Sequence, residues 1–351
     1  MRILVTGGAG FIGSHVTDAY IAAGHEVWVL DNMSRGKPEN VNHHAHLVQM
    51  DLRSPALKDL FAELQFDCVN HHAAQVDVRV SVADPLQDAA VNISGSLNLL
   101  EAVRAHGLPR VIFASTGGAI YGEQRRFPAD EEHPTAPMSP YGIAKLAVEH
   151  YLRYYAAVHR LRYTVLRYAN VYGPRQDPDG EAGVVAIFCG RALRRQLLTV
   201  YGEGSQTRDY VYVKDVARAS LLALQYLMAE RTMTSRPLVG NGKNGTPHLP
   251  VFNIGTGVET SVNALVALVL EAADADCSIA YQPARAGEQL RSAIDPQRAA
   301  AELGWKPETE LCDGLTESLS WFRTKTTIPE PIPQHLAAVD TLLTRETVLT
   351  Q

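Results

Sequence analysis

Two side chains in the segment SPYGIAK have the types and the spacing needed for proton transfer. Tyr141 and Lys145 are four residues apart, and Ser139 followed by Pro140 is typical of the cap and first position of a helix. Both side chains would then share one helix face. An ammonium group beside a phenol favours the phenolate, so Tyr141 could exchange a proton with a substrate hydroxyl near neutral pH. The same spacing is frequent on solvated helix faces, so it needs support from the rest of the chain.

A second pair of reactive groups, Ser115 and Thr116, ends the segment RVIFAST. The run VIFA before them is typical of a buried strand, so the two hydroxyls would lie where that strand ends. The next three residues, GGA, carry no group that can transfer a proton. The sequence therefore supplies two hydroxyls with no acid or base immediately after them.

A glycine-rich turn, TGGAGFIG, lies between a strand-like run, ILVT, and a helix expected to end near Ala23. Such a turn lets the backbone approach a pyrophosphate and directs free amides of a helix N-terminus toward it. A second strand-like run, EVWVLD, ends in Asp31, at the distance expected for a carboxylate that accepts adenosine ribose hydroxyls. The combination predicts a dinucleotide site that uses Gly7, Gly10 and Gly13.

The charges near the ribose decide between the two common dinucleotides. Asp31 would repel a 2′-phosphate, which favours NAD over NADP, whereas Arg35 and Lys37 nearby keep NADP as an alternative. Asp51, at the end of the third run HLVQMD, could contact the adenine or cap a helix. We therefore expect NAD.

The elements that must position these residues alternate between short apolar runs and amphipathic stretches. This alternation predicts an α/β fold, a doubly wound parallel sheet covered on both faces, with ligands at the carboxyl ends of the strands. After Gly173 the pattern loosens, a helix is expected near residues 184–195, and we predict a smaller second lobe with the ligand between the lobes. Residues 231–250 are expected to form an exposed loop, and the chain beyond about Thr324 a linker before a short helix.

The composition excludes several classes of protein. With 351 residues, 46% hydrophobic and 20% charged, the chain should be globular. Its formal net charge of -6 gives no basic footprint for nucleic acid, and no apolar stretch is long enough to span a bilayer. The first residues are expected to form a buried strand and not a signal peptide. The cysteines lack C-x-x-C spacing, so neither a disulfide framework nor a zinc site is expected, and a reducing cytoplasm fits.

The histidines are the remaining candidates for metal ligands. His43, His44 and His46 are close in sequence, as are His71 and His72. Neighbours on an extended strand point to opposite faces and do not easily share one ion. We therefore expect surface or packing roles for them and no metal.

Together these motifs resemble the extended branch of the short-chain dehydrogenase/reductase superfamily. Over nearly all of residues 1–322, the chain looks like the NAD-dependent nucleotide-sugar epimerases and dehydratases, in particular the bacterial UDP-glucose 4-epimerase-like proteins. The segments that carry this resemblance are TGGAGFIGSH, LDNMSRGKPEN, HHAAQVDVRVSVADP, VNISGSLNLLEA, STGGAIYGE, SPYGIAK, LRYANVYGPRQ and TRDYVYVKDVA. It implies a Rossmann-type NAD-binding domain at residues 1–174, with about 208–228 packing back on it, a discontinuous substrate-binding lobe at 175–325 and a tail at 326–351.

The resemblance also implies a reaction in which NAD stays bound and is not consumed. Tyr141 would remove the proton of the sugar 4-OH, Thr116 with Ser115 near it would hydrogen-bond that oxygen, and Lys145 would hold the nicotinamide ribose. A 4-keto sugar would form transiently and be reduced on its other face, which inverts one carbon. The implied NAD contacts are Gly7, Gly10, Phe11, Ile12, Gly13, Asp31, Asn32, Asp51, Leu52, Ala73, Ala74, Gln75, Asn92, Lys145 and Tyr168.

Within this family, the residues after Thr116 favour epimerisation. The 4,6-dehydratases carry Asp-Glu directly after the Thr, to protonate the departing 6-OH and to remove the C5 proton, and decarboxylating relatives place a Glu nearby. Here Gly117, Gly118 and Ala119 occupy these positions and cannot transfer protons. The alternative is that the small residues only reshape the loop.

Four further residues are implied to hold the substrate. Arg208 in TRDY and Arg285 in ARAGE would clamp the diphosphate, because guanidinium forks suit phosphate oxygens, and Glu288 would take a ribose hydroxyl. Asn170 in YANVYG matches the asparagine near the substrate phosphates in the epimerases, where uronate epimerases usually carry Thr. Arg79 nevertheless resembles an arginine of those uronate enzymes, so a UDP-glucuronate 4-epimerase stays an alternative. Each arginine could instead form a surface salt bridge.

Ser292 falls at the position that limits the space beside the sugar C2 substituent in the 4-epimerases. A tyrosine there crowds an N-acetyl group, whereas serine leaves room. We therefore expect UDP-N-acetylglucosamine and UDP-N-acetylgalactosamine to be accepted as well as UDP-glucose and UDP-galactose.

The resemblance also bears on partners and on competing functions. Helices near residues 85–106 and 142–159 carry wide apolar faces, which form a two-fold interface in the family, so a homodimer is expected. Neither nucleic acid nor a membrane is an expected partner. A nucleotide-sugar dehydratase or keto-sugar reductase and a non-catalytic NAD sensor remain alternatives, although intact Tyr141, Lys145 and Thr116 argue against the sensor.

Overall fold

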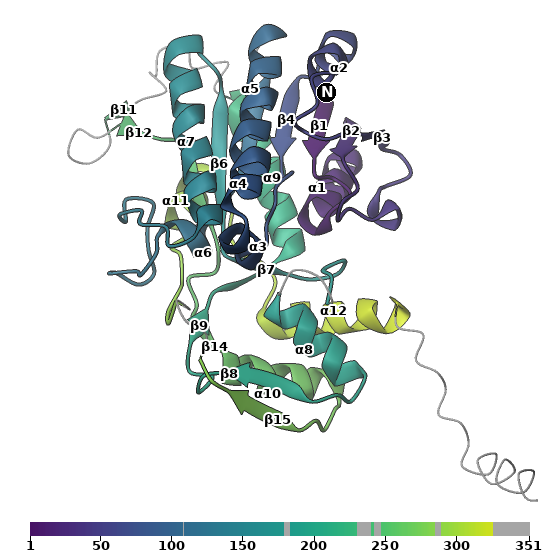
Figure 1. The fold of residues 1–351 in the computed structure, drawn as a ribbon, viewed down its shortest axis with the longest axis vertical. Helices are drawn as coiled ribbons and strands as arrows, with labels where there is room; N and C mark the ends of the chain where they lie inside the picture. The colour runs from purple at the N-terminus through teal and green to yellow at the C-terminus, as the bar shows by residue number, and fades with distance from the viewer. Residues whose placement is uncertain (108, 179–182, 230–239, 242–246, 285–288, 326–351) are drawn as a thin grey trace, which may run out of the picture.

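The protein is built on a parallel sheet with helices on both faces and a smaller lobe at one end (Figure 1). The computed structural model describes residues 1–107, 109–178, 183–229, 240–241, 247–284 and 289–325. Within these residues, the sheet has seven parallel strands in the order β13-β6-β5-β4-β1-β2-β3, which confirms the predicted doubly wound fold. The strands are β1 (Arg2–Thr6), β2 (Glu26–Asp31), β3 (His46–Gln49), β4 (Cys68–His71), β5 (Arg110–Thr116), β6 (Tyr163–Tyr168) and β13 (Val251–Ile254).

The central strands form because their apolar side chains alternate between two buried faces. In β1, Ile3 and Val5 join one apolar core and Leu4 joins the other. In β5, Ile112 joins the first core and Phe113 the second. Continuous apolar runs are therefore required here, rather than alternating apolar and polar residues.

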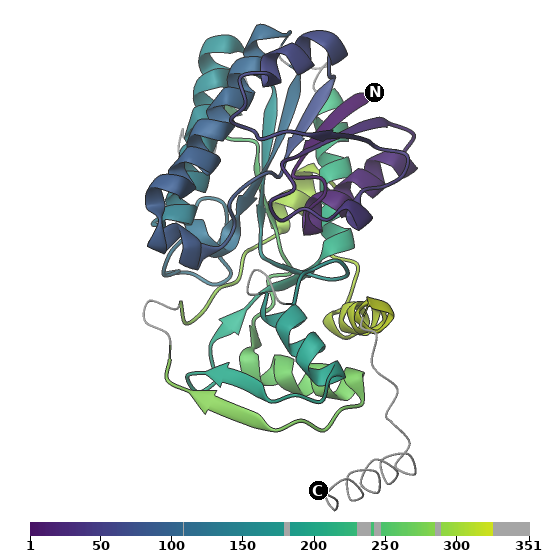
Figure 2. The same ribbon diagram turned by 45° about the vertical axis from the view of Figure 1, so that its right-hand side comes forward.

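Helices cover the two faces of the sheet (Figure 2). Their apolar residues complete the two cores, and the indole of Trp305 is fully buried in the first. The first face is covered by α1 (Phe11–Ala22), α9 (Val213–Ala229) and α11 (Gln297–Glu302), and the second by α2 (Leu57–Leu64), α5 (Gly95–Ala105) and α7 (Pro140–His159).

Strand order reverses between β1 and β4, and this reversal creates a crevice. The chain runs from β1 outward through β2 and β3, then returns to form β4 on the other side of β1. Ligands of such sheets bind at the carboxyl ends of the strands at this switch point. The glycine-rich turn follows β1 at that place.

The smaller lobe has an apolar core of its own (Figure 2). Phe188, Leu198, Leu265 and Leu319 are among its buried residues. The predicted helix near residues 184–195 is confirmed as the first helix of this lobe. Its principal elements are α8 (Val184–Leu193), β8 (Leu198–Tyr201), α10 (Val262–Ala273), β15 (Ile279–Gln282) and α12 (Leu311–Lys325).

Helix α7 begins as its sequence predicts. The Ser139 side chain accepts a hydrogen bond from the Gly142 amide at 3.1 Å, and Pro140 occupies the first helical position. Arg160, with φ of 62°, ends the helix in the left-handed region. The cap fixes where Tyr141 and Lys145 lie on the first two turns.

Short elements connect these parts. Helix α4 runs through a π-helical turn, η2, into α5. These elements are α3 (Val78–Ala83), α4 (Pro85–Ala89), η1 (Pro38–Asn40), η2 (Ala90–Ser94), α6 (Gly117–Ile120), β7 (Asn170–Tyr172), β9 (Thr207–Arg208), β10 (Tyr210–Tyr212), β11 (Gly240–Asn241), β12 (Pro247–His248) and β14 (Thr260–Ser261).

Two features differ from the strands expected from sequence. The run YTVLRYANVYG forms two strands, because β7 leaves the sheet at Ala169 and pairs with β10. The edge strand β13 was not predicted, since its four residues carry no distinctive signal. Much of the expected loop at residues 231–250, and the tail beyond residue 325, lie outside the described residues.

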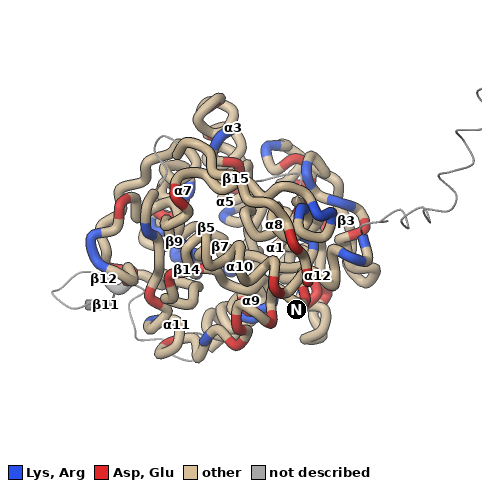
Figure 3. Tube along the Cα trace, turned by 90° about the horizontal axis from the view of Figure 1, so that it is seen from below, with Lys and Arg blue, Asp and Glu red and all other residues tan. Residues whose placement is uncertain are grey.

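Basic and acidic residues are mixed along the chain and, among the described residues, form no large region of one charge. Figure 3 shows basic and acidic residues interspersed along the chain trace seen from below. Among the described helices, none combines the length and hydropathy needed to cross a bilayer.

Candidate active site

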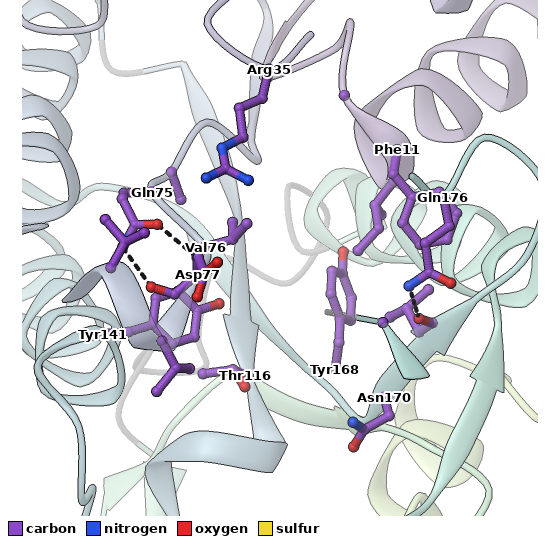
Figure 4. A pocket seen from close by; sticks show the side chains of 18 of the residues that line it. Phe11, Arg35, Gln75, Val76, Asp77, Thr116, Tyr141, Tyr168, Asn170 and Gln176 are labelled. Atoms are coloured by element: carbon purple, nitrogen blue, oxygen red, sulfur yellow. Dashed lines mark hydrogen bonds between the residues drawn. The ribbon is translucent and has the colours of Figure 1, made fainter. Parts of the chain in front are cut away.

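A cavity of about 1400 Å³ lies between the carboxyl ends of the strands and the smaller lobe (Figure 4). We call its lining residues numbered 7–170 the sheet wall and those numbered 171–262 the lobe wall. Figure 4 shows Thr116, Tyr141, Tyr168 and Asn170 around the same space. The cavity therefore brings together residues from strands that are far apart in sequence.

The glycine-rich turn leaves room for a phosphate group at the N-terminus of α1. Gly7 has φ of +70°, and a Cβ there would lie 2.7 Å from the Ala73 amide nitrogen. A Cβ at Gly13 would collide with the Gly7 carbonyl. Both positions thus need glycine, and the turn fits a dinucleotide pyrophosphate.

Carboxylates occupy the end of the cavity beyond this turn. Asp31 is buried and accepts hydrogen bonds from the amides of Met33 at 2.9 Å and Ala9 at 3.1 Å. Burial raises the pKa of Asp31 above its ordinary value, and these two bonds oppose that shift. Hydrogen bonds from Arg53 hold the pKa of Asp51 far below its usual range. An ionised carboxylate here suits ribose hydroxyls and repels a 2′-phosphate.

Every residue predicted to contact NAD lines the cavity except Asn92. Asn92 lies behind the wall, where its Oδ1 accepts from the Gln75 amide at 2.8 Å and its Nδ2 donates to the Gln75 carbonyl at 2.9 Å. It also donates to Asp88 at 2.9 Å. Asn92 therefore holds the wall segment in place from the second layer.

Lys145 is buried near the Tyr141 ring. Its Nζ donates to the Ala114 carbonyl at 2.9 Å and lies 6.0 Å from the centre of the Tyr141 ring. Burial lowers the pKa of Lys145 from its ordinary value of 10.5 to about 8, and the charges of Asp88 and Glu149 oppose this shift. At neutral pH the ammonium group is thus charged and close to the tyrosine.

The two hydroxyls that end β5 have different surroundings. Both residues line the cavity, but Ser115 is 4% exposed and its Oγ donates to Glu149 Oε1 at 2.6 Å. Thr116 is more exposed to the cavity. Thr116 is therefore the better placed of the two to meet a ligand oxygen.

Gly118, two residues after Thr116, lies close to the Thr116 and Asn170 side chains. A Cβ there would lie 3.6 Å from Asn170 Oδ1 and 3.9 Å from Thr116 Oγ1. A carboxylate at this position would consequently reach the Thr116 hydroxyl. Glycine leaves that place without an acid or base.

Among the described lining residues, the carboxylates are Asp31, Asp51 and Asp77. Asp77 accepts two hydrogen bonds from the Arg79 guanidinium, at 3.1 and 2.8 Å. These bonds hold the pKa of Asp77 below its ordinary value, so it is ionised at neutral pH. Asp77 therefore cannot act as a general acid.

The lobe wall presents guanidinium, amide and hydroxyl groups. The predicted substrate ligand Arg208 lines it, while Asn170 of the sheet wall faces it. Arg285 and Glu288 lie outside the described residues. Ser292 is 3% exposed and is not one of the described lining residues. The other polar residues that line this wall are Gln176, Arg191, Arg194, Gln196, Thr199, Tyr201, Gln206 and Tyr210.

Sequence reasoning missed most of the lobe wall. Arg191 lies on α8, an almost wholly apolar helix that resembles a core element, and it donates to Thr199 Oγ1 at 3.0 Å. Tyr201 ends β8, and Gln206 lies in the connection that follows it, which has ordinary loop composition. Tyr201 and Gln206 lie just before the TRDY segment in the sequence, and this position is the signal that could have identified them.

The adjacent histidines have separate hydrogen-bond partners. His71 bonds to Thr6 Oγ1 at 2.7 Å, whereas His72 bonds to the Tyr168 hydroxyl at 3.1 Å. Burial lowers the pKa of His72 to about 3, so its ring is neutral. In the described part of the chain, no group of three or more metal-binding side chains is gathered in one place.

Comparisons with known proteins give the family of this chain. Residues 3–234 match the model of the NAD dependent epimerase/dehydratase family. A UDP-glucose 4-epimerase of Mycolicibacterium smegmatis is 40% identical over 330 residues, 93% of this chain and 99% of that protein.

Solved structures agree with this match. A UDP-glucose 4-epimerase of Thermotoga maritima, solved with UDP-glucose, has a TM-score of 0.85 and 46% identity over 93% of this chain and 99% of its own. The Thermus thermophilus UDP-glucose 4-epimerase, solved with NAD, has a TM-score of 0.83 and 43% identity over 93% of this chain and 100% of its own. The chain therefore belongs to the NAD-dependent epimerase/dehydratase family.

Proposed function

We propose that this protein is an NAD-dependent epimerase that inverts C4 of a UDP-sugar through a transient 4-keto intermediate. The observation that carries the proposal is one cavity in which Tyr141, Lys145 and Thr116 stand beside a dinucleotide cradle. The names of the relatives support the same reaction. NAD held at this cradle would supply reversible hydride transfer at C4 of the sugar.

Side chains of the sheet wall would transfer the proton of the 4-OH and hydrogen-bond the oxygen at C4. Tyr141 takes the proton of the 4-OH as the carbonyl forms and returns it when the carbonyl is reduced. Thr116 donates a hydrogen bond to the same oxygen, and the Lys145 ammonium stabilises the ionised tyrosine. Because these groups act the same way on both faces of the ketone, no further acid or base is needed.

The absence of a second proton-transfer group near Thr116 supports epimerisation over dehydration. Gly118 occupies the place from which a carboxylate would reach the sugar, and Asp77 on the same wall is paired with Arg79. A dehydratase needs an acid for the departing hydroxyl and a base for the C5 proton. The carboxylates among the described lining residues are Asp31, Asp51 and Asp77, and none of them takes the place after Thr116 where the dehydratases carry Asp-Glu.

The pairing of Arg79 also disfavours the uronate alternative. Its guanidinium forms a two-point contact with Asp77, with Nη2 2.8 Å from Oδ2. A sugar carboxylate would have to compete with Asp77 for this arginine and would meet its negative charge. We therefore propose a neutral hexose, UDP-glucose or UDP-galactose.

We also propose that the N-acetylated sugars, UDP-N-acetylglucosamine and UDP-N-acetylgalactosamine, are accepted because Ser292 is small. Ser292 lies two residues before Ile294, whose side chain reaches the position of Gly117. The segment therefore passes close to the end of β5. The Ser292→Tyr variant should lose most activity on the N-acetylated sugars while it keeps activity on UDP-glucose.

A homodimer is part of the proposal, with α4, α5 and α7 at its interface. Large apolar side chains are exposed on two packed helices, Leu86 at 83% on α4, and Ile143 at 54%, Tyr154 at 50% and Val158 at 56% on α7. Burying such a face in a second copy would be favourable. Light scattering should give twice the chain mass, and Val158→Glu should give the monomer mass.

The four free cysteines fit a cytoplasmic location.

The first experiment is to incubate the purified protein, without added NAD, with UDP-glucose or UDP-N-acetylglucosamine and to follow the sugar by proton NMR. A mixture of 4-epimers supports both the reaction and a retained cofactor. Loss of water, or consumption of added NADH, would support a dehydratase or reductase. An inactive Tyr141→Phe variant that kept the biological role would favour the NAD sensor.

A further inference from the structure

A buried ion pair lies beneath the sheet wall, outside the cavity. Glu149 of α7 and Arg167 of β6 are 7% and 6% exposed, and Arg167 donates to Glu149 at 2.6 Å from Nη2 and at 3.1 Å from Nε. Removing two charges from water is costly, so such a pair is weak evidence for stability by itself. Its contacts indicate another role.

The Glu149 end of the pair is bonded to the residue before Thr116. Ser115 Oγ donates to Glu149 at 2.6 Å. One helical turn earlier, Lys145 donates to the carbonyl of Ala114 at 2.9 Å. Two consecutive residues of β5 are thus attached to two consecutive turns of the helix that carries Tyr141.

The Arg167 end is bonded to the other side of the same segment. Arg167 Nη1 donates to the Tyr121 hydroxyl at 3.0 Å, and this hydroxyl donates to Asn253 Oδ1 at 2.7 Å. Tyr121 follows the short helix α6, which begins directly after Thr116. Tyr121 is 1% exposed, so this attachment is buried as well.

We propose that Glu149 and Arg167 are positioning residues that set the place of Thr116 relative to Tyr141. The pair holds the segment from both ends, at Ser115 and at Tyr121, and one member of the pair belongs to the Tyr141 helix. The proposal rests on the proposed function for its kinetic test. A displacement of about 1 Å in such a site can cost about a hundredfold in rate.

Variants that cut one attachment at a time test this. Glu149→Gln keeps the shape of the side chain but removes its charge, while Ser115→Ala and Tyr121→Phe each remove one hydroxyl. We expect kcat to fall about 10- to 100-fold in Glu149→Gln and less in the other two. KM for the UDP-sugar and the bound NAD should change less than about twofold, because binding groups are untouched.

Asp215→Asn is the matched control for the loss of a buried charge. Asp215 is also paired with an arginine, since Arg218 Nη2 donates to its Oδ1 at 3.0 Å, and its side chain is 4% exposed, but it lies on α9 and is not one of the described lining residues of the cavity. This control should keep kcat. Ser115→Ala and Tyr121→Phe keep the ion pair, so they keep the test informative if Glu149→Gln does not fold.

A double-mutant cycle separates positioning from a general structural defect. If Tyr121 acts through Thr116, Tyr121→Phe should change kcat less than about twofold in a Thr116→Ala background. Equal effects in both backgrounds, or a joint change of kcat and KM, would overturn the proposal. A wild-type protein without epimerase activity would refute the proposed function instead.

Crystal structures test the geometry without any turnover. In the Ser115→Ala/Tyr121→Phe double variant, the distance between Thr116 Oγ1 and Tyr141 Oη should differ from that in the wild type. An unchanged distance would overturn the proposal even if the wild-type protein proved inactive.

Discussion

The two walls of the cavity are built differently. On the sheet wall, Lys145 and Ser115 are buried and attached to neighbouring elements, Lys145 to the Ala114 carbonyl and Ser115 to Glu149. On the lobe wall, Arg208 donates to Thr207 and Gln206 to Tyr201, both at 2.8 Å and both within the lobe. The sheet wall is thus suited to hold reacting groups in fixed positions. The polar groups of the lobe wall are attached within one lobe, so they are suited to bind a ligand together. We expect substitutions on the two walls to affect different kinetic constants.

The largest expected effect is on the sheet wall. Tyr141→Phe removes the proton-transfer group, and we expect the epimerisation rate to fall about 10²- to 10⁴-fold. The bound NAD should be retained, because the phenyl ring of the variant still fills the place of the tyrosine ring. Proton NMR gives the rate, and absorbance after denaturation gives the NAD content. More than a tenth of the wild-type rate would contradict the assignment of Tyr141.

On the lobe wall, Arg208→Ala should act on binding. Loss of a guanidinium bonded to a diphosphate should raise KM about 10- to 100-fold, with kcat changed only a few-fold. Arg323→Ala is a matched control, because Arg323 also lies in the lobe and donates to one carbonyl, that of Ala273. A fall in kcat without a change in KM would remove the distinction between the walls.

The charge of Lys145 makes activity and stability respond to pH in opposite directions. Its pKa is about 8 in the folded protein, against an ordinary value of 10.5. Between these pH values the unfolded chain holds a proton that the folded chain has lost, so the Lys145 contribution to the free energy of unfolding rises with pH. Activity should fall to about half near pH 8, because the neutral amine no longer stabilises the phenolate.

Rates between pH 6 and 10, and urea unfolding at pH 7.5 and 10, would measure both effects. The Lys145→Met variant should lack this part of the rise in stability. A rate that stays constant up to pH 9.5 would contradict the role of the Lys145 charge.

The smallest expected effects concern the two glycines after Thr116. A Cβ at Gly117 would lie 2.7 Å from Ile294 Cδ1, so Gly117→Ala should lower the free energy of unfolding by about 1–3 kcal/mol. At Gly118 the nearest atoms are 3.6 Å away, so Gly118→Ala should change it by less than about 0.5 kcal/mol. Thermal unfolding of both variants would check this. Equal effects would mean that the segment adjusts its backbone.

The same difference between the walls explains what could be predicted from the sequence. Strand ends and glycine turns are local signals, so they led to Gly7, Gly10, Gly13 and Asp31 and to Thr116, Tyr141 and Lys145, all of which line the cavity. Asn92, also predicted to contact the cofactor, is not one of the described lining residues, and sequence spacing does not show whether a residue lines a cavity or lies behind its wall. Glu149 and Arg167 carry no local signal, because their pairing depends on how α7 packs against β6.

The lobe wall was harder to predict because its chemistry depends on tertiary packing. Arg191 lies in an apolar helix, and its contact with Thr199 depends on how α8 packs against β8. Ser292 was predicted from its place in a family motif, and its effect on the sugar is still a prediction. Local patterns identify the groups that react more readily than those that select the ligand.

The edge strand β13 has a consequence for the order in which the protein can fold. Val251 pairs with Val165, which is 86 positions earlier in the chain. At about 5–20 residues per second, the ribosome needs several seconds to make this stretch, and β6 has no partner on that edge meanwhile. Helices α9 and α11, which cover one sheet face, are also made after β6. A nascent chain that ends near residue 174 would therefore expose both an unpaired strand edge and apolar surface, the two features that favour aggregation.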